Sequence, residues 1–158
     1  MKICFIGHRK IENLLNVRLL LKQTVLELIK KGADVFLFGS MSEFDGLAWE
    51  VVTEFKKDFP YIKRVYVRSA YKNINKFYED FLLKSYEETY FPPKIENAGK
   101  YSYVERNYDM INNSTYCVFY YNKNYVPNIK RNSGTKIAYE YAKKKKKEII
   151  NLYDLIFI

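Results

Sequence analysis

The sequence predicts an α/β fold built on a doubly wound, mainly parallel five-stranded sheet with helices on both faces. Short apolar runs of strand length alternate along the chain with segments whose apolar residues recur every three or four positions. This alternation is typical of a parallel sheet covered by helices. The length of 158 residues, with 48% hydrophobic and 28% charged residues, fits one globular domain spanning 1–158.

Five apolar runs have the length of buried strands, and polar or glycine residues bound them. They are 2–6, 34–38, 62–67, 116–121 and 148–152.

Helical spacing accounts for most of the chain between these strands. It predicts helices over 14–31, 44–57, 104–111 and 135–142. Gly32 has the position of a helix C-cap, and Pro60 lies just beyond the end of the second helix. The segment 74–90 is compatible with a helix, and we expect 94–102 to form an exposed loop.

The net charge of +9 favours an anionic partner, although the basic residues are scattered. The dense run Lys143–Lys147 falls at a predicted helix end, where cations are favourable, so we interpret it as a solvated end. Cys4 and Cys117 lie in separate strands, which indicates buried thiols in a reducing compartment. With a single histidine and two distant cysteines, the sequence offers no zinc-type cluster of metal ligands. We therefore expect neither a metal nor a cofactor.

The amino-terminal residues lack the pattern of a signal peptide, and no apolar run approaches the roughly 20 residues that span a bilayer. We therefore expect a soluble, cytoplasmic protein with no membrane partner. A homodimer is compatible with the sequence.

Polar loops follow three of the predicted strands, at 7–9, 39–43 and 122–135. In doubly wound sheets, ligands bind beyond the carboxyl ends of the strands, so these loops should gather at one edge. In the first loop, Gly7 permits a tight turn and Arg9 can bind a phosphate. His8 is either a ligand contact or a packing residue.

The second loop contains Gly39, Ser40, Met41 and Ser42, whose hydroxyl and amide groups can donate to an anion. Asp45 follows at the start of a helix, where it either caps the helix or contacts a ribose hydroxyl. Glu43 fits a ribose or base better than a phosphate, because like charges repel.

Ser133, Gly134 and Thr135 open the last predicted helix, whose N-terminus would attract a phosphate. A plain N-cap without a ligand is the alternative reading. Glu105, Arg106 and Asn107 bring three polar groups just before the fourth strand, as part of the site or as an exposed helix turn.

Several of these segments together resemble the SLOG superfamily of Rossmann-like proteins, in particular its small YpsA-like members. The matching stretches run in the expected order over nearly the whole chain: 4–9, 38–45, 106–111 with Ser114, 133–142 and 149–152. The resemblance implies a small nucleotide-type ligand between the loops at 39–45 and 133–135, with Arg9 and Arg106 at the rim. It also implies relatives that sense ADP-ribose-derived signals in antiphage defence, and relatives that hydrolyse nucleotides.

The sequence departs from these relatives at informative positions. Ser40 and Ser42 stand where relatives carry glycine, and Ala138 stands where phosphoribohydrolases carry their glutamate. The leading hypothesis is therefore the sensing or sequestering of an ADP-ribose-type or cyclic nucleotide, with a base stacked on Tyr121 or Tyr139.

Two alternatives stay open. The first is a nucleotide N-glycosidase, which needs a carboxylate; the candidates are Asp45 and Glu105, followed by Glu50 and Glu140. The second is nucleic-acid binding, which rests on the +9 charge and the high aromatic content.

Overall fold

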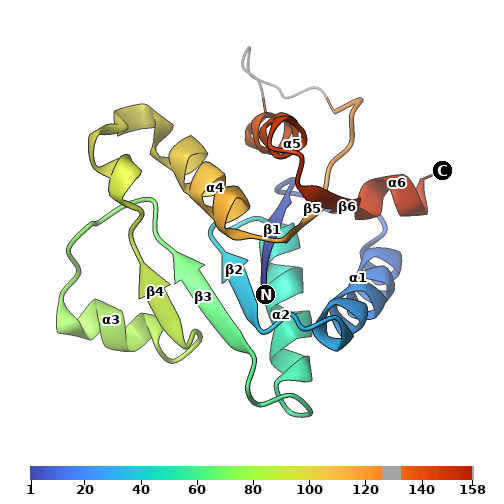
Figure 1. The fold of residues 1–158 in the computed structure, drawn as a ribbon, viewed down its shortest axis with the longest axis horizontal. Helices are drawn as coiled ribbons and strands as arrows, with labels where there is room; N and C mark the ends of the chain where they lie inside the picture. Colours follow the sequence, from blue (N-terminus) through green and yellow to red (C-terminus); the bar gives the residue numbers. More distant parts are fainter. Residues whose placement is uncertain (126–132, 158) are drawn as a thin grey trace.

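The computed structural model describes residues 1–125 and 133–157. Its centre is a six-stranded parallel sheet in the order β4-β3-β2-β1-β5-β6, with helices on both faces (Figure 1). The predicted fold class is confirmed, but the predicted number of strands is wrong by one.

The observed strands and helices follow the predicted segments closely. The strands are β1 (Lys2–Gly7), β2 (Val35–Phe38), β3 (Lys63–Val67), β4 (Glu88–Tyr90), β5 (Tyr116–Tyr120) and β6 (Glu148–Asn151). The α-helices are α1 (Leu14–Lys30), α2 (Glu43–Phe55), α3 (Lys76–Leu82), α4 (Ser102–Asn113), α5 (Gly134–Lys144) and α6 (Leu152–Ile156). Gly32 follows α1 with φ +109°, the conformation expected of a helix-ending glycine.

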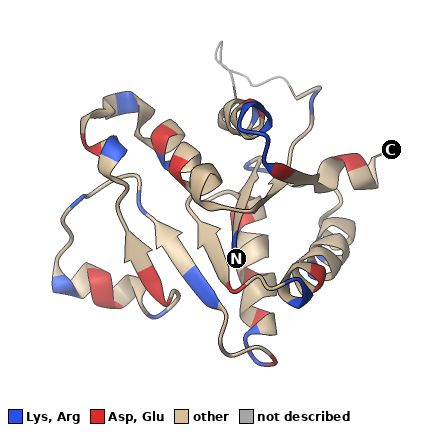
Figure 2. Cartoon of the chain, viewed as in Figure 1, with Lys and Arg blue, Asp and Glu red and all other residues tan. Residues whose placement is uncertain are grey.

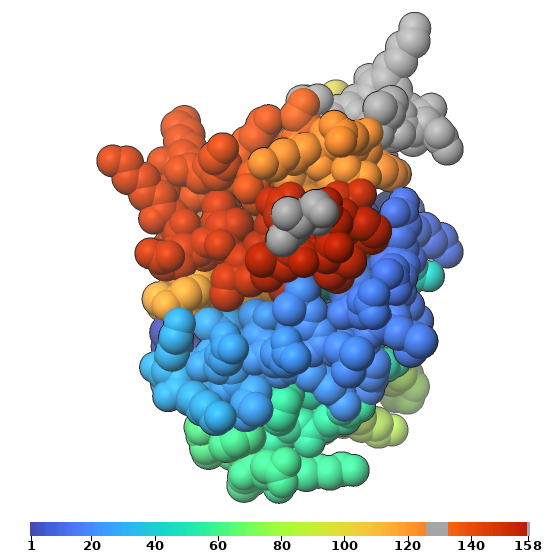
Figure 3. All heavy atoms as spheres, turned by 90° about the vertical axis from the view of Figure 1, so that its right-hand side faces the viewer, coloured from blue at the N-terminus to red at the C-terminus, as the bar shows by residue number. Residues whose placement is uncertain are grey.

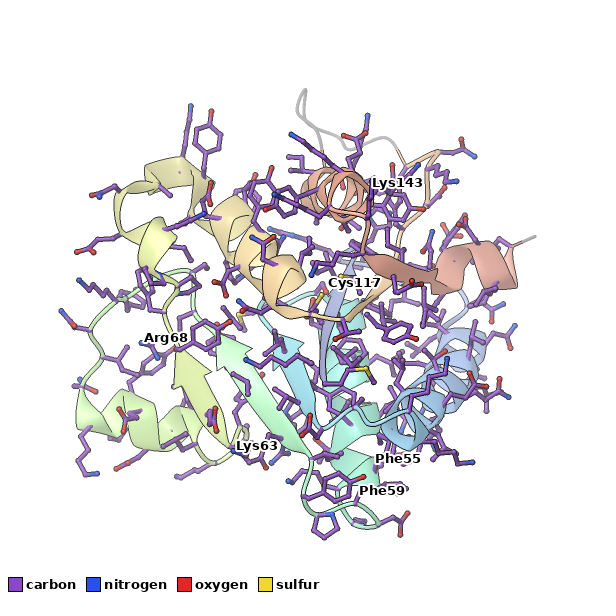
Figure 4. All side chains as sticks on the ribbon, in the orientation of Figure 1. Phe55, Phe59, Lys63, Arg68, Cys117 and Lys143 are labelled. Atoms are coloured by element: carbon purple, nitrogen blue, oxygen red, sulfur yellow. The ribbon has the colours of Figure 1, made fainter. Side chains whose placement is uncertain are left out.

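The sheet is buried on both faces because alternate residues of each strand point to opposite sides. On β1, Phe5 packs into a core with α1, α2 and the start of α6. Its neighbour Cys4 points to the other face, where α4 and α5 cover a second core that includes Cys117 (labelled in Figure 4). Both thiols are buried and unpaired, as the sequence predicts.

The unpredicted sixth strand, β4, is a short edge strand that pairs with β3. The segment 74–90 is thus not one helix: α3 ends at Leu82, and the chain then turns into β4. Only three residues form β4, so it lacks the apolar run that marks the other strands. Figure 1 shows α3 beside it at the left edge of the sheet.

Two other segments also differ from expectation. The expected exposed loop 94–102 contains the 3-10 turns η1 (Pro93–Asn97) and η2 (Gly99–Tyr101), and Ile95 is buried. The short helix α6 follows β6 without a loop and packs against α1, as Figure 3 shows in red above blue.

The strand order reverses at β1, which lies between β2 and β5. From β1 the chain proceeds outward to β4, and α4 then carries it back to β5 on the other side of β1. The carboxyl ends of all six strands meet at one edge, and a ligand crevice is expected beside the reversal. None of the helices described is long and apolar enough to cross a membrane.

Candidate functional site

A cleft of about 910 Å³ opens at the carboxyl edge of the sheet, beside the reversal of strand order. Its walls come from the ends of β1, β2 and β3, one face of α4 and the start of α5. The predicted ligand-binding residues that line it are Gly7, His8, Arg9, Gly39, Ser40, Met41, Ser42, Arg106, Asn107, Ser133, Gly134 and Thr135. Asp45 and Glu105 do not line it.

The loop after β1 is fixed by contacts with the start of α2. A Cβ on Gly7 would lie 2.5 Å from the Phe44 ring, so glycine lets α2 approach the strand end. The Glu43 N–H donates to the carbonyl of Arg9 at 3.0 Å, and the Glu43 carboxylate accepts the Ile11 N–H at 2.7 Å. Glu43 lines the cleft, but its carboxylate is held by this loop.

The loop after β2 contains the N-cap of α2, and that residue is Ser42. Its Oγ accepts the Asp45 N–H at 3.0 Å and donates to Asp45 Oδ2 at 2.6 Å. Ser40 also donates to Oδ2. The N-cap reading of Asp45 is therefore wrong, because Asp45 lies three residues into the turn that Ser42 begins.

Asp45 supports this loop from beneath the cleft. It is 4% exposed. Among the fully buried side-chain oxygen and nitrogen atoms of the described residues, its Oδ1 is the one without a hydrogen bond. Burial raises the pKa of the carboxyl, while the hydroxyls of Ser40 and Ser42 and the positive charge of Arg106 act against that rise. The carboxylate thus orders the loop rather than facing the cleft.

Arg106 is a buried positive charge in the wall of the cleft, whereas Arg9 and Lys10, which also line it, are exposed. Arg106 is 6% exposed, and its Nη1 donates to the Gly39 carbonyl at 2.6 Å and to Ser69 Oγ at 3.2 Å. Burial lowers the pKa of Arg106, which the charge of Asp45 opposes, and a guanidinium stays protonated. Among the described residues, Arg18 and Arg64 form ion pairs within 4.0 Å, whereas Arg106 does not.

The start of α5 forms the opposite wall. Ser133 is the N-cap, and its Oγ accepts the Lys136 N–H at 3.2 Å, which confirms the capping role. A Cβ on Gly134 would lie 3.4 Å from the Tyr103 ring, an ordinary van der Waals distance. Packing therefore requires glycine at position 7 but not at position 134.

Aromatic side chains in the cleft come from positions that the sequence reading missed. Tyr66, Tyr103 and Tyr125 line it, whereas Tyr121 and Tyr139 pack against each other, with ring centroids 4.7 Å apart, in the core between the sheet and α5. The base-stacking hypothesis for that last pair is not supported by their position.

Position in the fold could have identified several missed residues. Tyr66 lies near the carboxyl end of β3 and Ser69 follows that end, in the same way as the predicted loops follow β1 and β2. Tyr103 lies three residues before Arg106 on α4, on the same helix face. Arg68 binds its own loop instead, through the carbonyls of 71 and 72 (Figure 4).

The candidate catalytic carboxylates lie outside the cleft. Glu105 is half-buried on α4, Glu140 is exposed on α5, and Glu50 is paired with Arg18 at 2.9 Å. Among the described residues, Glu43 is the carboxylate that lines the cleft.

Within 1–125 and 133–157, no group of three or more His, Cys, Asp or Glu side chains could hold a metal ion. No protein-family model matches the chain, and no curated protein matches it either.

Proposed function

We propose that the protein binds a small anionic nucleotide-derived ligand, of the ADP-ribose or cyclic-nucleotide type, and senses or sequesters it. The observation that carries this proposal is Arg106, a buried cation without a carboxylate contact in the wall of a large cleft. A buried charge is costly unless it is paired, and the charge of Asp45 acts on Arg106 without forming an ion pair within 4.0 Å, so a phosphate would supply an anionic partner in direct contact. The resemblance to SLOG proteins agrees with this proposal.

Other features of the cleft suit the same ligand class. The N-termini of α2 and α5 both border it, and helix N-termini favour phosphate groups. Tyr66, Tyr103 and Tyr125 offer aromatic surface for a base. The cleft volume of about 910 Å³ is at the large end of small-molecule sites and leaves room for a dinucleotide-sized ligand.

The carboxylates favour binding over hydrolysis. An N-glycosidase needs a carboxylate at the reacting carbon. Asp45 is sealed beneath the loop, and the Glu43 carboxylate already accepts the Ile11 N–H. The N-glycosidase hypothesis therefore has less support from this geometry.

Nucleic-acid binding has less support too. Figure 2 shows Lys and Arg spread over many elements, with a group on α5. The run Lys143–Lys147 lies at the C-terminal end of α5, whereas the N-terminal end borders the cleft. The densest charge is thus on the opposite edge of the sheet from the cleft.

Isothermal titration calorimetry with ADP-ribose, NAD and 3′,5′-cyclic AMP tests the proposal. We expect saturable heat with at least one of them, weakening as salt rises. No heat with any of them would reject the proposal. Chromatography of the same mixtures separates binding from hydrolysis, since only hydrolysis releases free base.

A further inference from the structure

His8 occupies the point where the strand order reverses. It follows β1, and its backbone N–H donates to the Tyr120 carbonyl at 3.2 Å, which extends the pairing of β1 with β5. The side chain is 7% exposed, yet it lines the cleft. Its ring packs on Tyr125 with centroids 4.5 Å apart.

One ring nitrogen of His8 is already used. The backbone N–H of Asn122 donates to Nε2 at 2.9 Å, so Nε2 must present a lone pair and carry no proton. A neutral imidazole has one protonated nitrogen, and here that nitrogen is Nδ1. No described residue hydrogen-bonds Nδ1, and the His8 side chain lines the cleft.

The burial of the ring favours a neutral imidazole. Burial lowers the pKa of His8, and protonating Nε2 would bring its N–H against that of Asn122. A neutral His8 with a fixed tautomer can donate from Nδ1, but it cannot accept a proton there. It is therefore unsuited to act as a general base on the cleft side.

We propose that the Asn122 backbone fixes His8 as the Nδ1–H tautomer, and that this N–H donates a hydrogen bond to an anionic oxygen of the bound ligand. The second part rests on the proposed function. It adds a neutral donor at the end of β1 to the charged donor Arg106 on α4, so that the end of a strand and one face of a helix both contact the ligand. A phosphate oxygen suits this donor because it accepts and never donates when ionised.

The first test needs no ligand. The chain has a single histidine, so its ring signals in a ¹⁵N-labelled sample belong to His8 without further assignment. We expect long-range ¹H–¹⁵N spectra of the free protein near pH 7 to show a protonated Nδ1 and an unprotonated Nε2. An Nε2–H tautomer or a doubly protonated ring would overturn the proposal.

The second test compares two variants by titration with ADP-ribose and AMP. In His8→Gln the amide oxygen can take the place of Nε2 and accept the Asn122 N–H, but the Nδ1 donor is lost. In His8→Asn the amide nitrogen lies near the Nδ1 position and keeps a donor. We expect His8→Gln to weaken binding about tenfold and His8→Asn to weaken it less.

The outcomes separate the two proposals. Equal binding by His8→Gln and wild type, with both folded by circular dichroism, would overturn the ligand contact while leaving the proposed function intact. If the wild-type protein binds neither nucleotide, the proposed hydrogen bond from His8 to the ligand is overturned. The tautomer of His8 is decided by the NMR spectrum of the free protein alone. Lys144→Gln, at the far end of α5, is the matched control and should bind as wild type.

Discussion

Arg106 packs directly on the backbone of Gly39. Its Nη1 donates to the Gly39 carbonyl at 2.6 Å, and a Cβ on Gly39 would lie 2.8 Å from its Cδ and Nε atoms. The same Cβ would lie 2.8 Å from the sulfur of Met110. Because Gly39 has no side chain, it leaves room for Arg106, which lies in the wall of the cleft.

This contact predicts a specific effect of Gly39→Ala. The added methyl group must displace the Arg106 side chain, so we expect a loss of about 1–3 kcal/mol in the free energy of unfolding. Gly46→Ala is the control, because a Cβ there meets nothing within 4 Å and the residue lies within α2. It should stabilise the protein by about 0.5–1 kcal/mol. Urea unfolding measures both, and equal effects would contradict the packing argument.

The two N-caps predict different costs for serine removal. Ser133 caps α5 through one hydrogen bond, so Ser133→Ala should lower the free energy of unfolding by about 1 kcal/mol. Ser42 caps α2 and also donates to the buried Asp45, so Ser42→Ala should cost about 2–3 kcal/mol. Thermal unfolding of the two variants decides the order, and a cheaper Ser42→Ala would contradict the support role of Asp45.

Glu87 predicts a pH dependence of stability. Burial alone would raise the pKa of Glu87, but hydrogen bonds from Arg64 and Lys56 outweigh it and lower the pKa from 4.5 to about 2. A lowered carboxyl pKa stabilises the fold above pH 4.5, and this contribution disappears as the pH falls through about 2. Glu87→Gln should therefore cost about 1–3 kcal/mol at pH 7, allowing for partial exposure, and progressively less toward pH 2.

The matched control for Glu87 is Glu96, which pairs with Lys72 at 2.8 Å on the exposed surface. Glu96→Gln should change the free energy of unfolding by at most about 0.5 kcal/mol at either pH. A Glu87→Gln effect that stayed constant between pH 7 and pH 3 would show that its ion pairs with Arg64 and Lys56 do not provide the stabilisation.

The thiols predict a simple chemical result. Cys4 and Cys117 are both 0% exposed and face each other in the register of β1 and β5. Burial and the neighbouring Cys117 thiol raise the pKa of Cys4, which further slows its reaction. A disulfide reagent should modify neither cysteine in the folded protein and both after unfolding in guanidinium. Rapid modification of the folded protein would contradict the burial of this core.

Much of the fold follows from local patterns in the sequence. Five of the six strands and four of the α-helices have apolar runs or helical stripes that mark them in the sequence. The strand β4 lacks such a run, since its Glu88–Tyr90 backbone pairs with Val65–Val67 at a sheet edge. Its existence depends on contacts far apart in the sequence, which a local pattern does not contain.

The candidate site was predictable where position in a parallel sheet determines it. In a parallel sheet the loops after β1 and β2 and the loop before α5 must lie at the same edge, and all three line the cleft. The sequence could not tell which polar residue faces the cleft and which supports it, as Ser42 and Asp45 illustrate. The role of Gly39 was also hidden, because Arg106, 67 residues later, occupies the space that it leaves.

The role of Arg106 in ligand binding is tested most directly by calorimetric titration of wild type and Arg106→Gln with ADP-ribose, NAD and 3′,5′-cyclic AMP. Arg9→Gln, at the exposed rim of the cleft, provides a second variant should Arg106→Gln fail to fold. We expect saturable binding by wild type, weakened at least about tenfold in folded Arg106→Gln and less in Arg9→Gln. Absence of binding by wild type, or equal binding by folded Arg106→Gln, would contradict this role of Arg106.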